Sequence, residues 1–217
     1  MSTDTNMNQN AIRQDIERHP VIAILRGVQP QEVVAVVEAL LAEGVRIIEI
    51  PLNSPSPLLS IEAVAREFGD AVVTGAGTVL DAASVDAVAA AGGRIVVAPN
   101  CNPRVIERAL ALGLAPLPGV ATPSEAFAAL DAGARLLKMF PADTLGPATL
   151  KAWRSVLPDD AALIPVGGVT PDNLAAFRAA GALAFGIGSA LYKPGDSPEA
   201  VRARARAFVA AERAARG

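Results

Sequence analysis

The chain has 217 residues, of which 52% are hydrophobic and 19% are charged, and its formal net charge is −3. The acidic balance argues against nucleic acid or an anionic membrane as the main partner, because both call for a basic excess. One cysteine excludes a disulfide framework within the chain, and one histidine excludes most imidazole-based metal sites.

The first ten residues, MSTDTNMNQN, are polar and lack the basic and apolar regions of a secretory signal. No segment approaches the ~18 consecutive apolar residues of a membrane span. We therefore expect a cytoplasmic protein. Residues 1–7 are predicted to be a disordered tail, and residues 8–18 to form a helix that precedes the first strand.

From there the chain alternates between apolar, β-branched runs and Ala-rich helical stretches. Several helical stretches end at a glycine, as at Gly133 and Gly181, which suits the left-handed residue after a helix. Helix starts are marked by a cap followed by proline, as in the capping-box pattern Thr122–Glu125. The predicted strands cover residues 21–25, 45–50, 71–75, 94–98, 114–117, 135–140, 162–166 and 182–187.

Eight apolar strands with helical crossovers predict an α/β fold, a (β/α)₈ TIM barrel with the extra N-terminal helix, as a single domain over residues 8–217. An open, doubly wound sheet is the alternative. It is disfavoured because no GxGxxG motif follows the first strand. In a barrel of this kind the active site forms at the carboxyl ends of the strands, so polar residues there are the candidates.

Lys138 is the sharpest signal, because it lies in the apolar run RLLKMF. With a period of two it shares a face with Leu136 and Phe140, and on the inner face it would enter the barrel near its catalytic end. Burial lowers the pKa of an ammonium group and yields a neutral amine that can attack a carbonyl. The alternative is an ion-paired or snorkelling lysine.

Glu49, in the strand IIEIP, is the second signal. A buried carboxylate must be neutralised, paired or used in chemistry. Its strand is the second and that of Lys138 is the sixth. Alternate strands of a barrel contribute to common layers, so both groups can face one cavity. The alternative is a structural salt bridge.

Glycines follow the last two strands, at positions where barrel enzymes often bind phosphate through backbone N–H groups. They are Gly167 and Gly168 after the seventh strand and Gly188, followed by Ser189, after the eighth. Tight turns alone would also explain them.

Arg26 and Thr78 end the first and third strands, where they offer a guanidinium and a hydroxyl. Their alternatives are a solvated arginine and a helix N-cap. No metal-ligand cluster is apparent, and no metal or cofactor is expected.

The segments AILRG, GVRIIEIPLNSP, GAGTV, LKMFPA, VGGVTPDN and GIGSALY resemble the bacterial 2-keto-3-deoxy-6-phosphosugar-acid aldolases, the KDPG/KHG aldolase family. The resemblance runs in order from about residue 20 to 192. The IPLNSP segment resembles the galactonate-type members, whereas gluconate-type relatives carry an arginine at the position of Asn53 and a threonine at that of Val166.

The resemblance implies a class I aldolase that cleaves 2-dehydro-3-deoxy-6-phospho-D-galactonate to pyruvate and D-glyceraldehyde 3-phosphate, as a homotrimer without a metal. Lys138 would form the Schiff base and Glu49 would be the general acid/base. Arg26 and Thr78 would hold the substrate carboxylate, and because Asn53 replaces the arginine of gluconate-type relatives, the role of that arginine would pass to Arg26. The glycines and Ser189 would bind phosphate, and Val166 would face the C4 hydroxyl.

Three alternatives stay open. One is a gluconate-type or 4-hydroxy-2-oxoglutarate aldolase. A non-covalent, phosphate-binding barrel isomerase or synthase would explain the glycines but not the buried lysine. A non-catalytic binding or assembly barrel would explain the apolar composition but not an amine and an acid that face one cavity.

Overall fold

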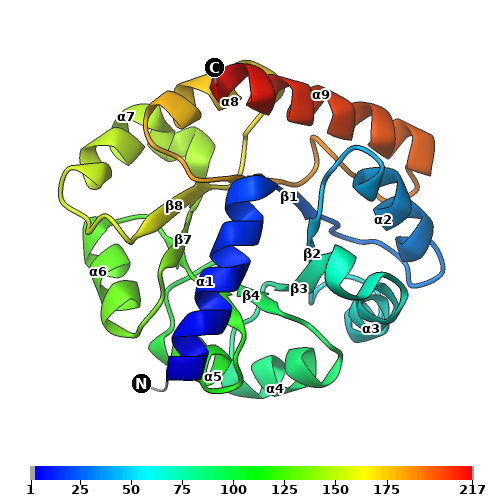
Figure 1. The fold of residues 1–217 in the computed structure, drawn as a ribbon, viewed down its shortest axis with the longest axis horizontal. Coiled ribbons are helices and arrows are strands. Elements are labelled where there is room, and N and C mark those ends of the chain that lie inside the picture. The colour runs from blue at the N-terminus through cyan, green and yellow to red at the C-terminus, as the bar shows by residue number, and fades with distance from the viewer. Residues whose placement is uncertain (1–2, 217) are drawn as a thin grey trace.

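The computed structural model describes residues 3–216 and the side chains of residues 9–216; it forms a ring of parallel strands enclosed by helices (Figure 1). The strands are β1 (Val21–Ile24), β2 (Ile47–Pro51), β3 (Val73–Gly77), β4 (Ile95–Val97), β5 (Ala115–Leu117), β6 (Gly119–Val120), β7 (Leu136–Met139), β8 (Ala162–Pro165) and β9 (Phe185–Ile187). The helices are α1 (Thr3–Arg18), α2 (Val33–Leu41), α3 (Pro57–Phe68), α4 (Ala82–Ala90), α5 (Pro103–Ala111), α6 (Pro123–Asp131), α7 (Ala142–Arg154), α8 (Pro171–Ala179) and α9 (Pro198–Arg216), with a short 3₁₀ turn at Gly69–Ala71.

The strands pair in sequence order and close on themselves. Six lie in the order β5-β4-β3-β2-β1-β9 and three in the order β6-β7-β8. Val166 pairs with Gly186 in a parallel bridge, and Leu183 N–H donates to the Leu163 carbonyl at 2.9 Å, which joins β8 to β9. This closed, sequential order confirms the predicted (β/α)₈ barrel with its N-terminal helix and is incompatible with an open, doubly wound sheet.

The fifth strand of the barrel is split into β5 and β6 at Pro118. β5 pairs with β4, and β6 pairs with β7. Proline has no N–H to donate, so the ladder is interrupted there, although the Pro118 carbonyl still accepts from Lys138 N–H at 2.9 Å. The eight predicted strands are therefore all present, and β6 is an added segment beyond the predicted end of the fifth strand at residue 117.

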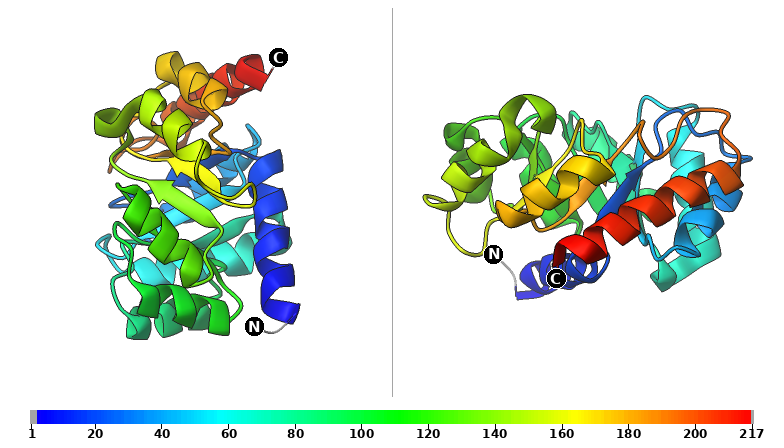
Figure 2. Two further views of the ribbon diagram at one scale, coloured as in Figure 1. Left: turned by 90° about the vertical axis from the view of Figure 1, so that its left-hand side faces the viewer. Right: turned by 90° about the horizontal axis from the view of Figure 1, so that it is seen from above.

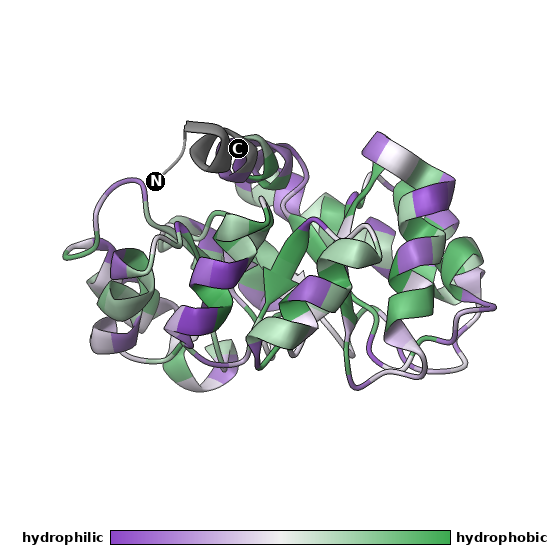
Figure 3. Cartoon of the chain, turned by 90° about the horizontal axis from the view of Figure 1, so that it is seen from below, coloured by the Kyte–Doolittle hydropathy of each residue, from purple (hydrophilic) through white to green (hydrophobic). Residues whose placement is uncertain are grey.

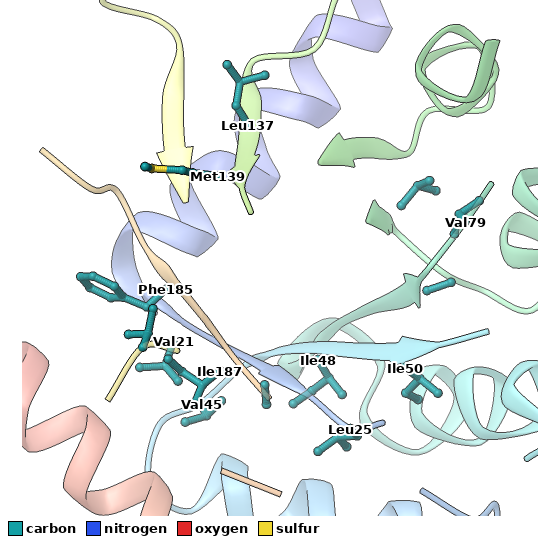
Figure 4. Packing of buried hydrophobic residues seen from close by; sticks show 14 of the residues in the cluster. Val21, Leu25, Val45, Ile48, Ile50, Val79, Leu137, Met139, Phe185 and Ile187 are labelled. Carbon is teal, nitrogen blue, oxygen red and sulfur yellow. The ribbon is translucent and has the colours of Figure 1, made fainter. Parts of the chain in front are cut away.

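Two apolar layers hold the barrel together. One lies between strands and helices, where Val21, Phe185 and Ile187 cluster on the outer faces of β1 and β9 (Figure 4). The other fills the barrel interior and includes Ile47 and Leu136, with Ile12 and Ile16 of α1. Figure 3 shows the apolar strands at the centre and polar residues along the surrounding helices.

Helix α1 (Thr3–Arg18) covers the amino-terminal end of the barrel (Figures 1 and 2). Gln9 fastens it there, because its side chain accepts from Arg135 N–H at 3.0 Å. The helix begins at Thr3, five residues before the predicted boundary at residue 8. Extending a helix that is anchored by packing costs little compared with nucleating one. Residues 1–2 lie outside the described residues.

Helix ends follow the sequence signals. Glu125 N–H donates to the Thr122 hydroxyl at 3.3 Å, and Thr122 N–H donates to the Glu125 carboxylate at 3.0 Å, which is the predicted capping box. Gly133 and Gly181 have φ of 100° and 102°, which few other residues adopt. Within the described part of the chain, no helix has the length and apolar character needed to cross a membrane.

Candidate active site

A cavity of about 830 Å³ opens at the carboxyl ends of the strands. Its volume lies within the range of ~300–1,000 Å³ that is common for small-molecule sites. Of the ten residues singled out from the sequence, all but Asn53 line it: Lys138, Glu49, Arg26, Thr78, Val166, Gly167, Gly168, Gly188 and Ser189.

Lys138 and Glu49 enter this cavity from opposite strands of the ring, β7 and β2. Lys138 is 6% exposed and Glu49 is 2% exposed. Lys138 lies two residues after Leu136, and Glu49 lies two residues after Ile47. Leu136 and Ile47 pack in the barrel interior, and side chains two residues apart share a face, so the predicted inward face is confirmed for both strands. Among the described residues neither group has an ion pair, which contradicts the salt-bridge alternative for each.

Burial shifts both groups toward their neutral forms. It lowers the pKa of the Lys138 amine below the ordinary lysine value, with Glu49 opposing that shift and Arg26 adding to it. It raises the pKa of the Glu49 carboxyl above its ordinary value, while Lys138 and Arg26 oppose the rise. The result is an amine that reaches its neutral, nucleophilic form more readily than a solvated lysine, beside a carboxyl group that can exchange a proton.

Gly77 makes room for the Glu49 carboxyl group. A Cβ atom at position 77 would overlap Oε1 of Glu49, so any other residue there would displace the carboxyl group from its present position. This role of Gly77 was not predicted from the sequence. The sequence feature that could indicate it is the small-residue run GAG at the end of the neighbouring strand. Only the register of the strands in the barrel shows that the Glu49 side chain fills the space beside Gly77.

Phe140 is a second residue whose role the sequence analysis missed. Its ring lines the cavity, and the centroid lies 5.0 Å from Nζ of Lys138. An aromatic face at this distance stabilises the protonated amine. The sequence does contain a signal for this position, because the alternation of side chains along a strand places Lys138 and Phe140 on the same face.

Asn53 lies beside the cavity rather than on it. Its side-chain Oδ1 accepts from Nη1 of Arg26 at 2.6 Å. Arg26 is exposed to solvent, as the alternative of a solvated strand-end arginine expects, and this bond directs its guanidinium along the cavity wall. Asn53 acts on the cavity through this guanidinium.

Thr78 has a φ of 58°, an uncommon conformation for a β-branched residue. The alternative role as N-cap of α4 is wrong, because Asp81 holds that position and its carboxylate accepts from Ser84 N–H at 2.8 Å. With this backbone conformation, the residue that follows β3 forms part of the cavity wall.

The glycine loops after β8 and β9 form one end of the cavity. Gly167 and Gly168 have φ of 94° and 71°, and Asn173 Nδ2 donates to the Gly168 carbonyl at 2.8 Å, which fixes the peptide. After β9, the N–H groups of Leu191 and Tyr192 donate to the Gly188 carbonyl at 2.8 and 3.0 Å. This closes a helical turn whose first N–H groups, at Gly188 and Ser189, lie at the cavity.

A family model described as KDPG and KHG aldolase matches residues 12–201. That match covers all the strands and all the residues that line the cavity. The chain belongs to the KDPG and KHG aldolase family.

Two relatives in this family are especially similar. The chain is 48% identical to 2-dehydro-3-deoxy-6-phosphogalactonate aldolase of Escherichia coli K12, over 90% of this chain and 96% of that protein. It is 50% identical to a probable 2-dehydro-3-deoxy-6-phosphogalactonate aldolase of Rhizobium meliloti, over 88% and 91% of the two chains.

Solved structures of relatives agree with the fold. A native KDPGal structure superposes with a TM-score of 0.89 at 48% identity, over 90% of this chain and 95% of that one. KDPG aldolase from Legionella pneumophila, 26% identical with a TM-score of 0.82, was captured with pyruvate as a covalent carbinolamine intermediate, and the match covers 90% and 97% of the chains. A chain of a designed cage, made by fusing symmetric oligomeric domains, matches with a TM-score of 0.89 at 48% identity, over 91% of this chain and 73% of that one.

Proposed function

We propose that this member of the family is a class I aldolase that cleaves 2-dehydro-3-deoxy-6-phospho-D-galactonate to pyruvate and D-glyceraldehyde 3-phosphate. The observation that carries the proposal is the Lys138 amine, buried in β7 without an ion pair among the described residues and directed into the cavity opposite Glu49. The names of the two similar relatives support the galactonate substrate. The covalent pyruvate adduct of the Legionella relative supports amine chemistry.

In the proposed reaction the neutral Lys138 amine attacks the C2 ketone of the substrate. Loss of water from the carbinolamine gives an iminium ion, which can accept the electron pair of a breaking bond. Glu49, through a water molecule, takes the proton of the C4 hydroxyl, and the C3–C4 bond breaks to release glyceraldehyde 3-phosphate. The enamine left on Lys138 takes a proton at C3 from Glu49, and hydrolysis of the iminium releases pyruvate and the free amine.

The two ends of the substrate are proposed to bind at opposite sides of this pair. Arg26, held by Asn53, and Thr78 receive the carboxylate beside the C2 ketone. The N–H groups of the glycine loops and the Ser189 hydroxyl receive the phosphate. Fixing both ends places C2 at the amine and makes cleavage effectively intramolecular.

Reductive trapping tests the covalent step. We expect borohydride, added with pyruvate, to attach a reduced pyruvate adduct to Lys138, which peptide mass spectrometry locates. The adduct should form equally well with a chelator present, because no step uses a metal. An unmodified protein, or an adduct on Lys151 or Lys193 alone, contradicts the assignment.

Val166 is proposed to set the preference between the two C4 epimers. It lines the cavity at the end of β8 and has no group that can bond to the C4 hydroxyl. Threonine has nearly the same shape, so Val166→Thr should fold normally and shift the ratio of kcat/KM toward the gluconate epimer by about tenfold, the effect of one modest hydrogen bond. Pyruvate release from both epimers measures the ratio. An unchanged ratio, or a wild type that strongly prefers the gluconate epimer, contradicts this specificity.

We also propose that the chain forms a homotrimer. An apolar groove of about 380 Å³ lies between α3 and α4, lined by Leu52, Leu58 and Leu59 among others. Leu59 is 59% exposed and Leu80, just before α4, is 52% exposed, so a second copy would bury both. The symmetric oligomeric domains of the cage relative support such an assembly.

A highly charged, phosphorylated substrate favours action in the cytoplasm, since such molecules do not cross bilayers unaided.

A charge in the groove tests this surface. We expect Leu59→Glu to convert the assembly to monomers, because a carboxylate cannot be buried there without a partner. Light scattering coupled to size-exclusion chromatography measures the mass. Val156→Glu is the matched control, because Val156 is 57% exposed but lies away from the groove, in the segment between α7 and β8. Equal masses for Leu59→Glu and wild type place the interface elsewhere.

A further inference from the structure

We propose that Lys193 is a further substrate-binding residue, which pairs with the phosphate group and makes the enzyme favour phosphorylated substrates. This inference rests on the proposed function and adds a charged partner to the uncharged glycine loops. Lys193 lies in the segment between β9 and α9, five residues after Gly188, and it lines the same cavity.

The glycine loops proposed to bind the phosphate supply no positively charged side chain. Among the described residues that line it, the cations are Arg26, Lys138 and Lys193, and the acid is Glu49. Lys138 must be neutral to react, and Arg26 is held by Asn53 at the proposed carboxylate end. The N–H groups of the glycine loops carry no net charge. Lys193 is thus the cation left for a phosphate dianion on this side of the cavity.

The backbone on either side of Lys193 is fixed, so its position over the cavity is not accidental. On one side the buried Tyr192 donates its hydroxyl to Oε1 of Glu32 at 2.7 Å. On the other side Pro194 lies against Gly27, where a Cβ atom would come within 2.7 Å of the proline Cγ. These contacts tie the segment to the loop that follows β1.

Asp196 attracts the Lys193 amine electrostatically, but its carboxylate is already bonded to other groups. Asp196 is the nearest acidic residue in the segment, and its carboxylate accepts from Lys193 N–H at 2.7 Å and pairs with Arg204 at 2.6 Å. Among the described residues, no ion pair involves the Lys193 amine. The exposed amine therefore has its charge available for an anion that enters the cavity.

Direct binding of inorganic phosphate tests this role without any chemical step. We expect Lys193→Gln to weaken the phosphate Kd measured by calorimetry about tenfold, the lower end for a hydrogen bond to a charged group. The same change should raise KM for the phosphorylated substrate by a similar factor with kcat nearly unchanged, because the contact is present in both the ground state and the transition state. Lys193→Arg should restore most of both values.

Lys151→Gln is the matched control, because it removes an exposed lysine of α7 that lies outside the cavity. Pyruvate trapping on Lys138 should proceed equally in wild type, Lys193→Gln and Lys151→Gln, since pyruvate carries no phosphate. Phosphate binding by Lys193→Gln as tight as that of wild type, or an equal loss in Lys151→Gln, overturns the proposal. A wild type that binds phosphate through Lys193 but forms no pyruvate adduct overturns the proposed aldolase instead.

Discussion

Lys138→Ala is expected to lower turnover by at least about 10⁴-fold while the barrel stays folded. Removing the nucleophile of a covalent enzyme costs on the order of 10⁶-fold in rate, and only binding and electrostatic effects are left. The side chain projects into an open cavity rather than into the packed interior, so alanine leaves no sealed void. Pyruvate release measures the rate, and circular dichroism with thermal unfolding checks the fold.

Lys138→Arg separates nucleophilicity from charge. Arginine keeps a cation opposite Glu49 but cannot lose its proton at accessible pH, so it cannot form an imine. We expect this variant to be as inactive as Lys138→Ala, with phosphate binding intact at the far end of the cavity. Turnover above one-hundredth of wild type in either variant would mean that Lys138 does not carry the covalent step.

The barrel could be predicted because its signals are local. Each β-branched run, each cap such as Thr122 and each helix-ending glycine such as Gly133 reports on its own segment, and short right-handed crossovers leave few ways to arrange eight such units. The break at Pro118 and the early start of α1 at Thr3 were not predicted. Both depend on what neighbouring strands and the barrel end provide, which a single segment does not show.

The centre of the site was predictable for a related reason. An amine and a carboxylate in otherwise apolar strands are costly, and they can meet because β2 and β7 are the second and sixth strands of the barrel, which share the same parity. The surroundings were not predictable, because they depend on contacts between distant segments. The space that Gly77 leaves for Glu49, and the bond from Arg26 to Asn53, join residues 27 or more positions apart.

Glu49→Gln is expected to slow cleavage by roughly 10²–10⁴-fold, the usual contribution of a general acid/base, while pyruvate trapping on Lys138 persists. Glutamine has nearly the same shape and fits over Gly77, so the cavity is retained. The amide cannot take the proton of the C4 hydroxyl or return one to the enamine. The comparison of pyruvate release with borohydride trapping therefore isolates proton transfer from imine formation.

The pH dependence of trapping gives the same variant a second, signed readout. The Glu49 carboxylate favours the charged form of Lys138 and so opposes the lowering of its pKa by burial, whereas Arg26 favours the neutral amine. Only the neutral amine attacks pyruvate, so the trapping rate rises as pH increases through the pKa of Lys138. Loss of the carboxylate in Glu49→Gln should move this rise to lower pH, and Arg26→Gln should move it to higher pH. Near-normal cleavage by Glu49→Gln would show that another group exchanges the proton. A rise in trapping displaced to higher pH would show that Glu49 does not favour the charged form of Lys138.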